Sequence, residues 1–223
     1  NTATVGGGQG NDSIFLSVAP TASELRGGAG SDTLAINGNY VSSTIVGAGT
    51  GVAEDDSADS ISISGSLSAA YLQGNKGNDT LQINSAVKGA SLVRGGKDSD
   101  RITIGSSVTA STVYGDLGND TLLIGGSVVS ATVQGGSDND TSTDGTDSIS
   151  IGGSLSSAYL QANAGNDTLT VSGAAYNSSI YAGKNNDQIN AVSTLRKTQL
   201  YGNDGNDSFV VGSVNTEMLT ATV

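Results

Sequence analysis

The sequence predicts an all-β protein, a parallel β-solenoid of about ten coils of about 20 residues each, with two facing parallel sheets. Three observations lead to this fold class. A glycine-rich turn ending in Asn-Asp recurs along the chain, an alternating apolar strand follows each turn, and no stretch shows the spacing of an amphipathic helix.

The recurring turn sets the period. The intervals between the aspartates that close successive turns are 20, 27, 20, 21, 20, 27, 20, 20 and 20 residues. These aspartates are Asp12, Asp32, Asp59, Asp79, Asp100, Asp120, Asp147, Asp167, Asp187 and Asp207. A repeat of this length cannot bury its apolar face alone and stacks on its neighbours. The two long intervals predict insert loops at about residues 48–58 and 138–147, and residues 60–73 return almost unchanged as 148–161.

The residues after each Asp alternate between apolar and other side chains, which is typical of a strand with one buried face. The apolar pairs are Ile14/Leu16, Leu34/Ile36, Ile61/Ile63, Leu81/Ile83, Ile102/Ile104, Leu122/Ile124, Ile149/Ile151, Leu169/Val171 and Phe209/Val211. A polar corner follows each of these strands. Each coil therefore consists of a strand, a corner, a second strand and a glycine turn.

The second strand of each coil should end in an inward apolar residue, with a small inward residue two positions earlier. The apolar residues are Val5, Leu25, Ile45, Leu72, Leu92, Val113, Val133, Leu160, Ile180 and Leu200. The small ones are Ser23, Ser43, Ala70, Ala90, Ser111, Ala131, Ala158, Ser178 and Thr198. Tyr71, Tyr114, Tyr159, Tyr181 and Tyr201 should point outward, either as a contact stripe between rods or because Tyr favours strands. Ten coils at the strand spacing would form a rod roughly 50 Å long.

Composition excludes several classes of protein. With 35% hydrophobic and 4% aromatic residues, the chain can fill a thin core but not a thick globular one. Its formal charge of −12 argues against nucleic acid and anionic membranes as partners, and it has no transmembrane run. It has no His and no Cys, and its carboxylates recur periodically instead of pairing in a pocket, so we do not expect an enzyme.

The uninterrupted period indicates one elongated domain over residues 1–223. The sequence begins in mid-repeat, and residues 220–223 repeat residues 2–5 as Thr-Ala-Thr-Val. We therefore expect a segment of a longer or end-to-end stacked array. Self-association, head to tail into a filament, is the expected partner interaction, and chance similarity of a low-complexity tetrapeptide is the alternative.

Stacking places the turn aspartates in one column, and this column needs a counter-charge. At about 5 Å, neighbouring carboxylates repel by roughly 1 kcal/mol in water and about 3 kcal/mol at an effective dielectric of 20. Calcium takes six to eight oxygen ligands in flexible geometry, and glycine turns can direct carbonyl oxygens toward such an ion. The sequence therefore predicts Ca²⁺ between adjacent turns. The alternative is that each Asp only caps its own turn.

The insert loops are a second candidate site. Asp138, Asp140 and Asp144 precede Asp147 in one insert, and Asp55 and Asp56 precede Asp59 in the other. These carboxylates could form an additional calcium site, or they could belong to solvated acidic loops.

Residues 7–15 and 27–35 match the pattern G-G-x-G-x-D-x-apolar-x, and in this they resemble the RTX nonapeptide repeat. The resemblance implies calcium binding in a parallel β-roll and a secreted bacterial protein. The chain departs from that pattern because it has one motif per coil, so ions should line a single edge. This arrangement is similar to the calcium-dependent solenoid of bacterial ice-binding adhesins. Later turns diverge, with a Lys in 97–101 and in 184–188 and lost glycines in 161–164, which puts calcium binding there in question.

These observations favour a calcium-dependent structural module of a bacterial extracellular assembly, either a fibre, a surface layer or an adhesin stalk. Three alternatives stay open, namely an ice-binding solenoid, a carbohydrate-binding adhesin solenoid that contacts a polysaccharide or cell surface, and the RTX secretion or folding domain of a secreted enzyme. Ice-binding adhesins place Thr between the turn glycines. Here the corresponding residues are Gln9, Ala29, Lys76, Leu117, Ala164 and Asp204.

Overall fold

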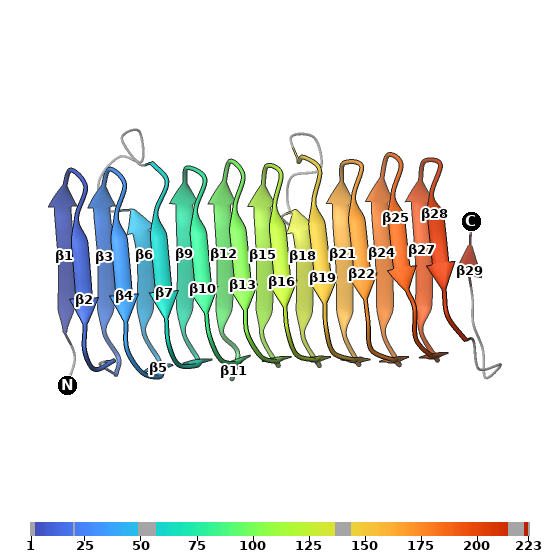
Figure 1. Cartoon of the computed structure of the whole chain (residues 1–223), viewed down its shortest axis with the longest axis horizontal. Coiled ribbons are helices and arrows are strands. Elements are labelled where there is room, and N and C mark those ends of the chain that lie inside the picture. The colour runs from blue at the N-terminus through green and yellow to red at the C-terminus, as the bar shows by residue number, and fades with distance from the viewer. Residues whose placement is uncertain (1–2, 20, 49–56, 137–143, 214–220, 223) are drawn as a thin grey trace.

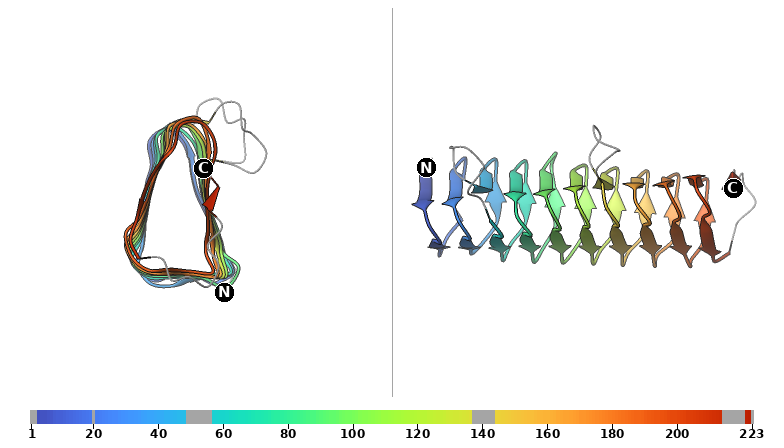
Figure 2. Two further views of the ribbon diagram at one scale, coloured as in Figure 1. Left: turned by 90° about the vertical axis from the view of Figure 1, so that its right-hand side faces the viewer. Right: turned by 90° about the horizontal axis from the view of Figure 1, so that it is seen from above.

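A computed structural model of the chain describes residues 3–19, 21–48, 57–136, 144–213 and 221–222. Every element in these ranges is a β-strand, and the strands stack into a rod with the N- and C-termini at opposite ends (Figure 1). Viewed along the rod, the coils superpose on a triangular outline (Figure 2). The predicted parallel β-solenoid is therefore confirmed. None of the described segments is a helix with the length and apolar character needed to cross a membrane.

The first side of the triangle is a parallel sheet of eleven strands that ends at the glycine turns. Its strands are β1 (Thr4–Gln9), β3 (Glu24–Ala29), β6 (Thr44–Ala48), β9 (Tyr71–Lys76), β12 (Leu92–Lys97), β15 (Thr112–Leu117), β18 (Thr132–Gly136), β21 (Tyr159–Ala164), β24 (Ser179–Lys184), β27 (Gln199–Asp204) and β29 (Ala221–Thr222). We call it the first sheet.

The second side is a parallel sheet of ten strands that begins just after the turn aspartates. Its strands are β2 (Ser13–Leu16), β4 (Thr33–Ile36), β7 (Ser60–Ile63), β10 (Thr80–Ile83), β13 (Arg101–Ile104), β16 (Thr121–Ile124), β19 (Ser148–Ile151), β22 (Thr168–Val171), β25 (Gln188–Ala191) and β28 (Ser208–Val211).

A third sheet of eight two-residue strands closes the triangle. Its strands are β5 (Tyr40–Val41), β8 (Leu67–Ser68), β11 (Val87–Lys88), β14 (Val108–Thr109), β17 (Val128–Val129), β20 (Leu155–Ser156), β23 (Ala175–Tyr176) and β26 (Leu195–Arg196). The sequence predicted two facing sheets joined here by a polar corner, and the number of sheets was wrong because the corner is itself a strand. The corner is a strand because its first residue, for example Val87 or Val108, is fully buried and turns inward beside the same residue of the next coil.

The core is built of identical positions stacked in register. Leu81 pairs with Ile61 on one side and Ile102 on the other, and all three are buried. The alternating pattern predicted the inward face of the second sheet correctly. On the first sheet, one coil was misassigned. Val93, not Leu92, aligns with Leu72 and Val113 and is buried.

The misassignment has a local cause in the one coil of 21 residues. The equivalent corners have a single residue at positive φ, for example Ala110 at 46°, whereas this corner has two successive ones, Gly89 at 66° and Ala90 at 61°. The extra residue is therefore absorbed in the corner, and everything after it shifts by one. Ser91, not Ala90, accordingly occupies the small inward position and is buried.

The small inward column also has a hydrogen-bonding role that the pattern did not predict. A serine hydroxyl in this column accepts the backbone N–H of the equivalent residue one coil earlier, as Ser111 does from Ser91 and Ser43 does from Ser23, at 3.2 and 3.0 Å. The same hydroxyl donates to a carbonyl at the corner, for example from Ser111 to Thr109. The predicted outward tyrosines lie half-buried on the first sheet, where the rings of Tyr181 and Tyr201 stack 4.9 Å apart.

Tyr40 places a phenol in the core without a hydrogen-bond partner for its hydroxyl. The residue is fully buried where the next coil has Leu67, and burial raises the pKa of its hydroxyl. We expect Tyr40→Phe to raise the thermal midpoint of the calcium-loaded protein, because a buried hydroxyl without a partner costs about 1–3 kcal/mol. Tyr71→Phe is the matched control. The Tyr71 hydroxyl donates to Gln73, so this variant should gain nothing. A lower midpoint for Tyr40→Phe would contradict the expectation.

Candidate metal centre

The turns between the first and second sheets require left-handed backbone at alternate positions. In the coil that ends at Asp120, Asp116 has φ of 82° and Gly118 has φ of 129°. Equivalent positions in other coils are glycine, asparagine or aspartate, as with Asn75 at 90° and Asn185 at 79°. Only these residue types enter this region readily, so the variable turns keep one backbone path even where the glycines are lost.

The backbone path brings the turn aspartates into one buried column. The described structure aligns all ten, and each of the eight from Asp32 to Asp187 is 3% exposed or less. One carboxylate oxygen, Oδ1, accepts the backbone N–H of the aspartate one coil earlier at 2.7–3.0 Å, from Asp12 to Asp32 through to Asp187 to Asp207. The column is thus a hydrogen-bonded ladder between coils, not a set of caps within single turns.

A second, exposed ladder runs beside the first. The side-chain oxygen of the residue before the aspartate accepts a backbone N–H from the next coil, as Asn11 does from Ser31 and Asn166 does from Asn186, at 2.9 and 3.0 Å. This contact explains why Asn precedes Asp in so many turns. The Asn therefore has a structural role, whereas the Asp has a second carboxylate oxygen that its ladder does not use.

That second oxygen, Oδ2, is the outstanding feature of the site. It is buried and has no hydrogen-bond partner in nine of the ten column aspartates, namely Asp12, Asp32, Asp59, Asp79, Asp100, Asp120, Asp147, Asp167 and Asp187. Buried polar atoms in native proteins are nearly always paired, and a buried charge needs a counter-charge. A row of unpaired carboxylate oxygens at one level therefore fits a column of cations.

In seven coils, Oδ2 faces a main-chain oxygen across a space kept open by glycine. A Cβ atom added to Gly115 would lie 2.4 Å from Asp120 Oδ2 and 2.3 Å from the carbonyl oxygen of Gly135 in the next coil. The same pair of oxygens surrounds Gly7, Gly27, Gly47, Gly74, Gly95 and Gly135, with distances of 2.0–2.4 Å to Oδ2 and 2.3–2.7 Å to the carbonyl. A carboxylate and a carbonyl oxygen that converge from two coils are the hard ligands that calcium prefers. We call this arrangement the glycine cradle.

Two coils differ at the cradle. Ala162 and Ala182 occupy the position of the cradle glycine in the turns that end at Asp167 and Asp187, and both alanines are fully buried. The sequence raised doubt about calcium binding in these two turns because glycines are lost or a Lys is present. The structure adds a steric reason, since a methyl group fills the space between the oxygens.

Burial makes the column carboxylates unusually weak acids in the absence of metal. Burial, followed by repulsion from neighbouring aspartates, raises the pKa of Asp100 and of Asp147 to about 9, against the partial compensation of the backbone N–H that each accepts. The same causes raise the pKa of Asp120 and Asp167 to about 7 and that of Asp187 to about 6. A divalent ion would replace these protons.

The predicted insert site is only partly described. Asp55, Asp56, Asp138 and Asp140 lie outside the described residues. Asp144 lies within them, and its Oδ2 is buried without a hydrogen-bond partner. A Cβ on Gly136 would lie 1.9 Å from this oxygen. Burial raises the pKa of Asp144 to about 6, and its charge in turn raises that of Asp147. The insert thus brings a further carboxylate against the column.

Calcium at these positions would depend mainly on main-chain oxygens. Within the described ranges, no three carboxylates gather into one site. The sequence did predict that carbonyl oxygens would contribute, but it could not identify which ones. The cradle glycines and their carbonyl groups belong to the repeated motif, but the sequence did not identify them as site residues. The sequence also did not indicate a role for Asp116. Its buried carboxylate lies beside the column and is bound by Arg94.

Comparisons with known proteins agree with this geometry. Four segments, residues 64–82, 110–126, 170–191 and 199–215, match the RTX calcium-binding nonapeptide repeat (4 copies) and together span less than half of the chain. No curated protein sequence matches the chain. Among solved structures, the fold is similar to that of a hyperactive, Ca²⁺-dependent, β-helical antifreeze protein from an Antarctic bacterium, with 25% identity and a TM-score of 0.66. The match covers 92% of this chain and 65% of that one. The repeats are therefore RTX-like calcium-binding repeats.

Proposed function

Because the chain is a solenoid of RTX-like calcium-binding repeats, we propose that it is a calcium-dependent structural module of a bacterial extracellular assembly, such as a fibre, a surface layer or an adhesin stalk. The rod would act as a spacer whose stiffness depends on bound calcium. Its site residues would be the ten column aspartates, the seven cradle glycines and, in the insert, Asp144. No catalytic role is assigned to any of them.

The observation that carries this proposal is the row of buried, unpaired Oδ2 atoms. A purely structural solenoid has no reason to bury a carboxylate in every coil, because an asparagine would serve the ladder equally well through its side-chain oxygen. The second ladder shows this, since Asn11 and Asn166 accept the same kind of backbone hydrogen bond. The negative charge is explained if it binds metal.

Calcium would also decide where the chain folds. When a site exists only in the folded state, the free energy of ion binding becomes free energy of folding. Sites of weak affinity, in the range of about 10⁻⁴ to 10⁻³ M that extracellular modules use, stay empty in the cytosol and fill outside the cell. The chain would therefore leave the cell unfolded and become a rod on contact with external calcium.

We also propose that copies associate end to end. The ladders between coils are directional, since the N–H of each column aspartate donates to the aspartate one coil further along the rod. Head-to-tail contact would continue this direction, whereas head-to-head contact would place two like ends together. A heterologous contact that does not close gives a filament.

Metal analysis and electron microscopy of one sample test both proposals. After gel filtration in calcium, we expect close to seven bound ions per chain along the edge, one for each glycine cradle. Variants Ala162→Gly and Ala182→Gly should each add about one ion by opening a closed cradle. Filaments of single-rod width are expected in calcium. One ion or none per chain would contradict the metal assignment, and monomers at all protein concentrations would contradict only the end-to-end association.

Ice binding is a second candidate, which the similarity to an antifreeze protein supports. The residues between the turn glycines argue against it on this edge of the rod. Gln9 and Asp204 are exposed, Ala29, Lys76 and Leu117 are half-exposed, and Ala164 is buried. Side chains that differ so much in length and charge do not form a flat, regular array.

A further inference from the structure

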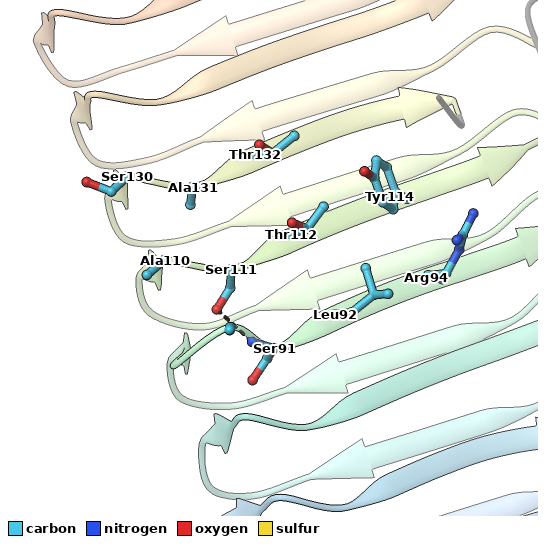
Figure 3. A pocket seen from close by; sticks show the side chains of 11 residues that line it. Ser91, Leu92, Arg94, Ala110, Ser111, Thr112, Tyr114, Ser130, Ala131 and Thr132 are labelled. Carbon is cyan, nitrogen blue, oxygen red and sulfur yellow. Dashed lines mark hydrogen bonds between the residues drawn. The ribbon is translucent and has the colours of Figure 1, made fainter. Parts of the chain in front are cut away.

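A trough lies on the outer face of the first sheet, away from the edge of the rod that carries the aspartate column. It has a volume of about 610 Å³ and crosses β12, β15 and β18 beside the corner where the third sheet meets the first (Figure 3). This volume is within the range of about 300–1,000 Å³ that is common for small-molecule sites. The corner residues Ala90, Ala110 and Ser130 form one rim.

The floor of the trough is one row of outward residues, which in these three coils lies between two tyrosines of the same row. Leu92, Thr112 and Thr132 are paired in register, and the row continues into Tyr71 on one side and Tyr159 on the other. These three side chains are shorter than the tyrosines on either side, so they leave a depression that is three coils long. Its length is therefore defined by side-chain size and not by the backbone.

The far wall is a rigid pair of side chains, Arg94 and Tyr114. The Nε and Nη2 atoms of Arg94 donate to the carboxylate of Asp116, which is 4% exposed, and the guanidinium lies 5.1 Å from the centroid of the Tyr114 ring. A bidentate contact to a buried acid fixes the guanidinium plane. The Nη1 edge is thus turned away from Asp116, and it presents fixed donors beside an aromatic ring.

These groups have the chemistry of a site for a neutral sugar. Threonine and serine hydroxyls both donate and accept, the guanidinium donates in a fixed plane, and the tyrosine combines an apolar ring with a hydroxyl. An anionic polymer is disfavoured, because Asp116 already neutralises Arg94 and the chain carries a net charge of −12. An extended peptide would need a free sheet edge, and β15 is paired on both sides.

A second trough repeats the arrangement nearer the N-terminus. It has a volume of about 460 Å³ and is lined by Thr4, Glu24 and Thr44 in the floor row, with Arg26 on the wall. Arg26 occupies the second outward position of its strand, as Arg94 does, and it is bound by a carboxylate, that of Glu24. Tyr71 separates the two troughs along the rod.

We propose that the trough over Leu92, Thr112 and Thr132, walled by Arg94 and Tyr114, binds a neutral oligosaccharide that lies along the rod. This deepens the proposed function by naming a partner class for the extracellular module, and it rests on that function only for the location of the protein. Asp116 lies between the aspartate column and Arg94, so the variants that test the trough leave Asp116 and the column aspartates unchanged.

The test is a binding assay on the calcium-loaded full chain. Neutral hexasaccharides of glucose, mannose, galactose and N-acetylglucosamine are the probes, and saturation-transfer NMR followed by calorimetric titration is the readout. We expect saturable binding of at least one of them. The double variant Thr112→Tyr, Thr132→Tyr should weaken it at least tenfold by filling the floor with a side chain that the fold already accepts at Tyr71 and Tyr159. Tyr114→Ala should weaken it severalfold.

Ser179→Tyr is the matched control, because Ser179 pairs with Tyr159 in the same outward row but does not line the trough. This variant should bind the sugar as the parent chain does. The proposal is overturned if no hexasaccharide binds, if the double variant binds with parent affinity, or if the control loses binding as well. Circular dichroism of the same samples reports folding, so a failure of the calcium proposal would be recognised independently of sugar binding.

Discussion

Chelation of calcium at neutral pH is expected to remove most of the β-sheet circular dichroism of this protein. The reason is the buried column. Without a cation, each column aspartate must either stay ionised next to its neighbours or take up a proton when the chain folds. Asp100 and Asp147 take up the proton at neutral pH, because their pKa in the folded chain is about 9. Each unit by which folding raises such a pKa, up to the pH of the solution, costs about 1.4 kcal/mol. Several such residues together exceed the net stability of about 5–15 kcal/mol of an ordinary domain.

Acid should partly restore the calcium-free fold. Burial, the main cause, raises the folded-state pKa values of the column above the ordinary value of 3.8, to between about 6 and about 9. The folded chain therefore holds protons that the unfolded chain releases as the pH rises above about 4. The stability of the metal-free form is greatest near that pH and falls as the pH rises to about 9. In calcium the order reverses, because protons compete with the metal at low pH.

Circular dichroism in four conditions measures both effects. We expect a full β-sheet signal with calcium at neutral pH, little signal with EDTA at neutral pH, and recovery of signal with EDTA as the pH is lowered toward about 4. Magnesium at the same concentration should replace calcium poorly, because it needs a compact octahedral set of ligands. Full β structure in excess EDTA at neutral pH would contradict the calcium requirement.

The repeat period and the alternation of apolar residues were sufficient to predict the solenoid and the inward face of the second sheet. Each coil supplies the same residues at the same positions, so an error in one coil does not propagate through a chain with a fixed period. The exception shows the limit. One extra residue near Gly89 moved the inward position from Leu92 to Val93, and the local pattern Leu-Val offered no way to choose between two adjacent apolar residues.

The third sheet was hidden by its length. Two residues per strand give no alternation to detect, and the corner sequences are rich in Ser and Gly, which indicate turns. What makes Val108 and its equivalents a strand is the contact with the same residue one coil away. Such a contact depends on the coils being in register and not on any local preference.

For the site, the sequence predicted which aspartates align but not what their oxygens do. The motif could not show that Oδ1 bonds to the preceding coil while Oδ2 is left over, because the two oxygens of one carboxylate are equivalent in a sequence. It likewise could not show the trough, which arises from comparing the sizes of side chains in one row across five coils, from Tyr71 to Tyr159. Both features are relations between coils.

Replacement of one column aspartate by asparagine is expected to have opposite effects with and without calcium. In Asp100→Asn, the side-chain oxygen can still accept the N–H of Asp79, as Oδ1 now does at 2.8 Å. The new amide group takes the place of Oδ2 and faces the carbonyl oxygen of Gly115 across the cradle of Gly95. The variant therefore keeps the ladder, removes a buried charge and introduces a donor toward an existing acceptor.

In EDTA at neutral pH the variant should be more stable than the parent chain. The parent must protonate Asp100, whose pKa is raised from 3.8 to about 9 mainly by burial, and the variant need not. The gain should be on the order of 4 kcal/mol at neutral pH, because roughly three pH units separate the ordinary pKa from the pH of the solution. It should disappear as the pH approaches about 4, where the unfolded parent is protonated as well.

In calcium the same variant should be less stable than the parent and should bind about one ion fewer, because an amide nitrogen cannot serve as a calcium ligand. Asp98→Asn is the control. Asp98 is an exposed residue of the same turn, and its equivalent in the turn that ends at Asp187 is Asn185, so its charge is not required there. This control should change neither the number of ions nor the stability by more than about 0.5 kcal/mol.

The crossing of the two stabilities distinguishes a metal ligand from a structural residue. If Asp100 served only the ladder, asparagine would be neutral or stabilising in both conditions, because the hydrogen bond is retained and the buried charge is gone. If it were needed only for packing, the variant would be destabilised in both. A metal ligand behaves differently, because its charge destabilises the empty turn and stabilises the turn that holds a cation. Its replacement by asparagine gives a gain of stability in EDTA and a loss in calcium. Chemical denaturation of parent, variant and control measures the difference in calcium. In EDTA, where the parent is expected to fold only as the pH is lowered, the readout is the pH at which each chain gains its β-sheet circular dichroism, and this pH should be higher for the variant than for the parent.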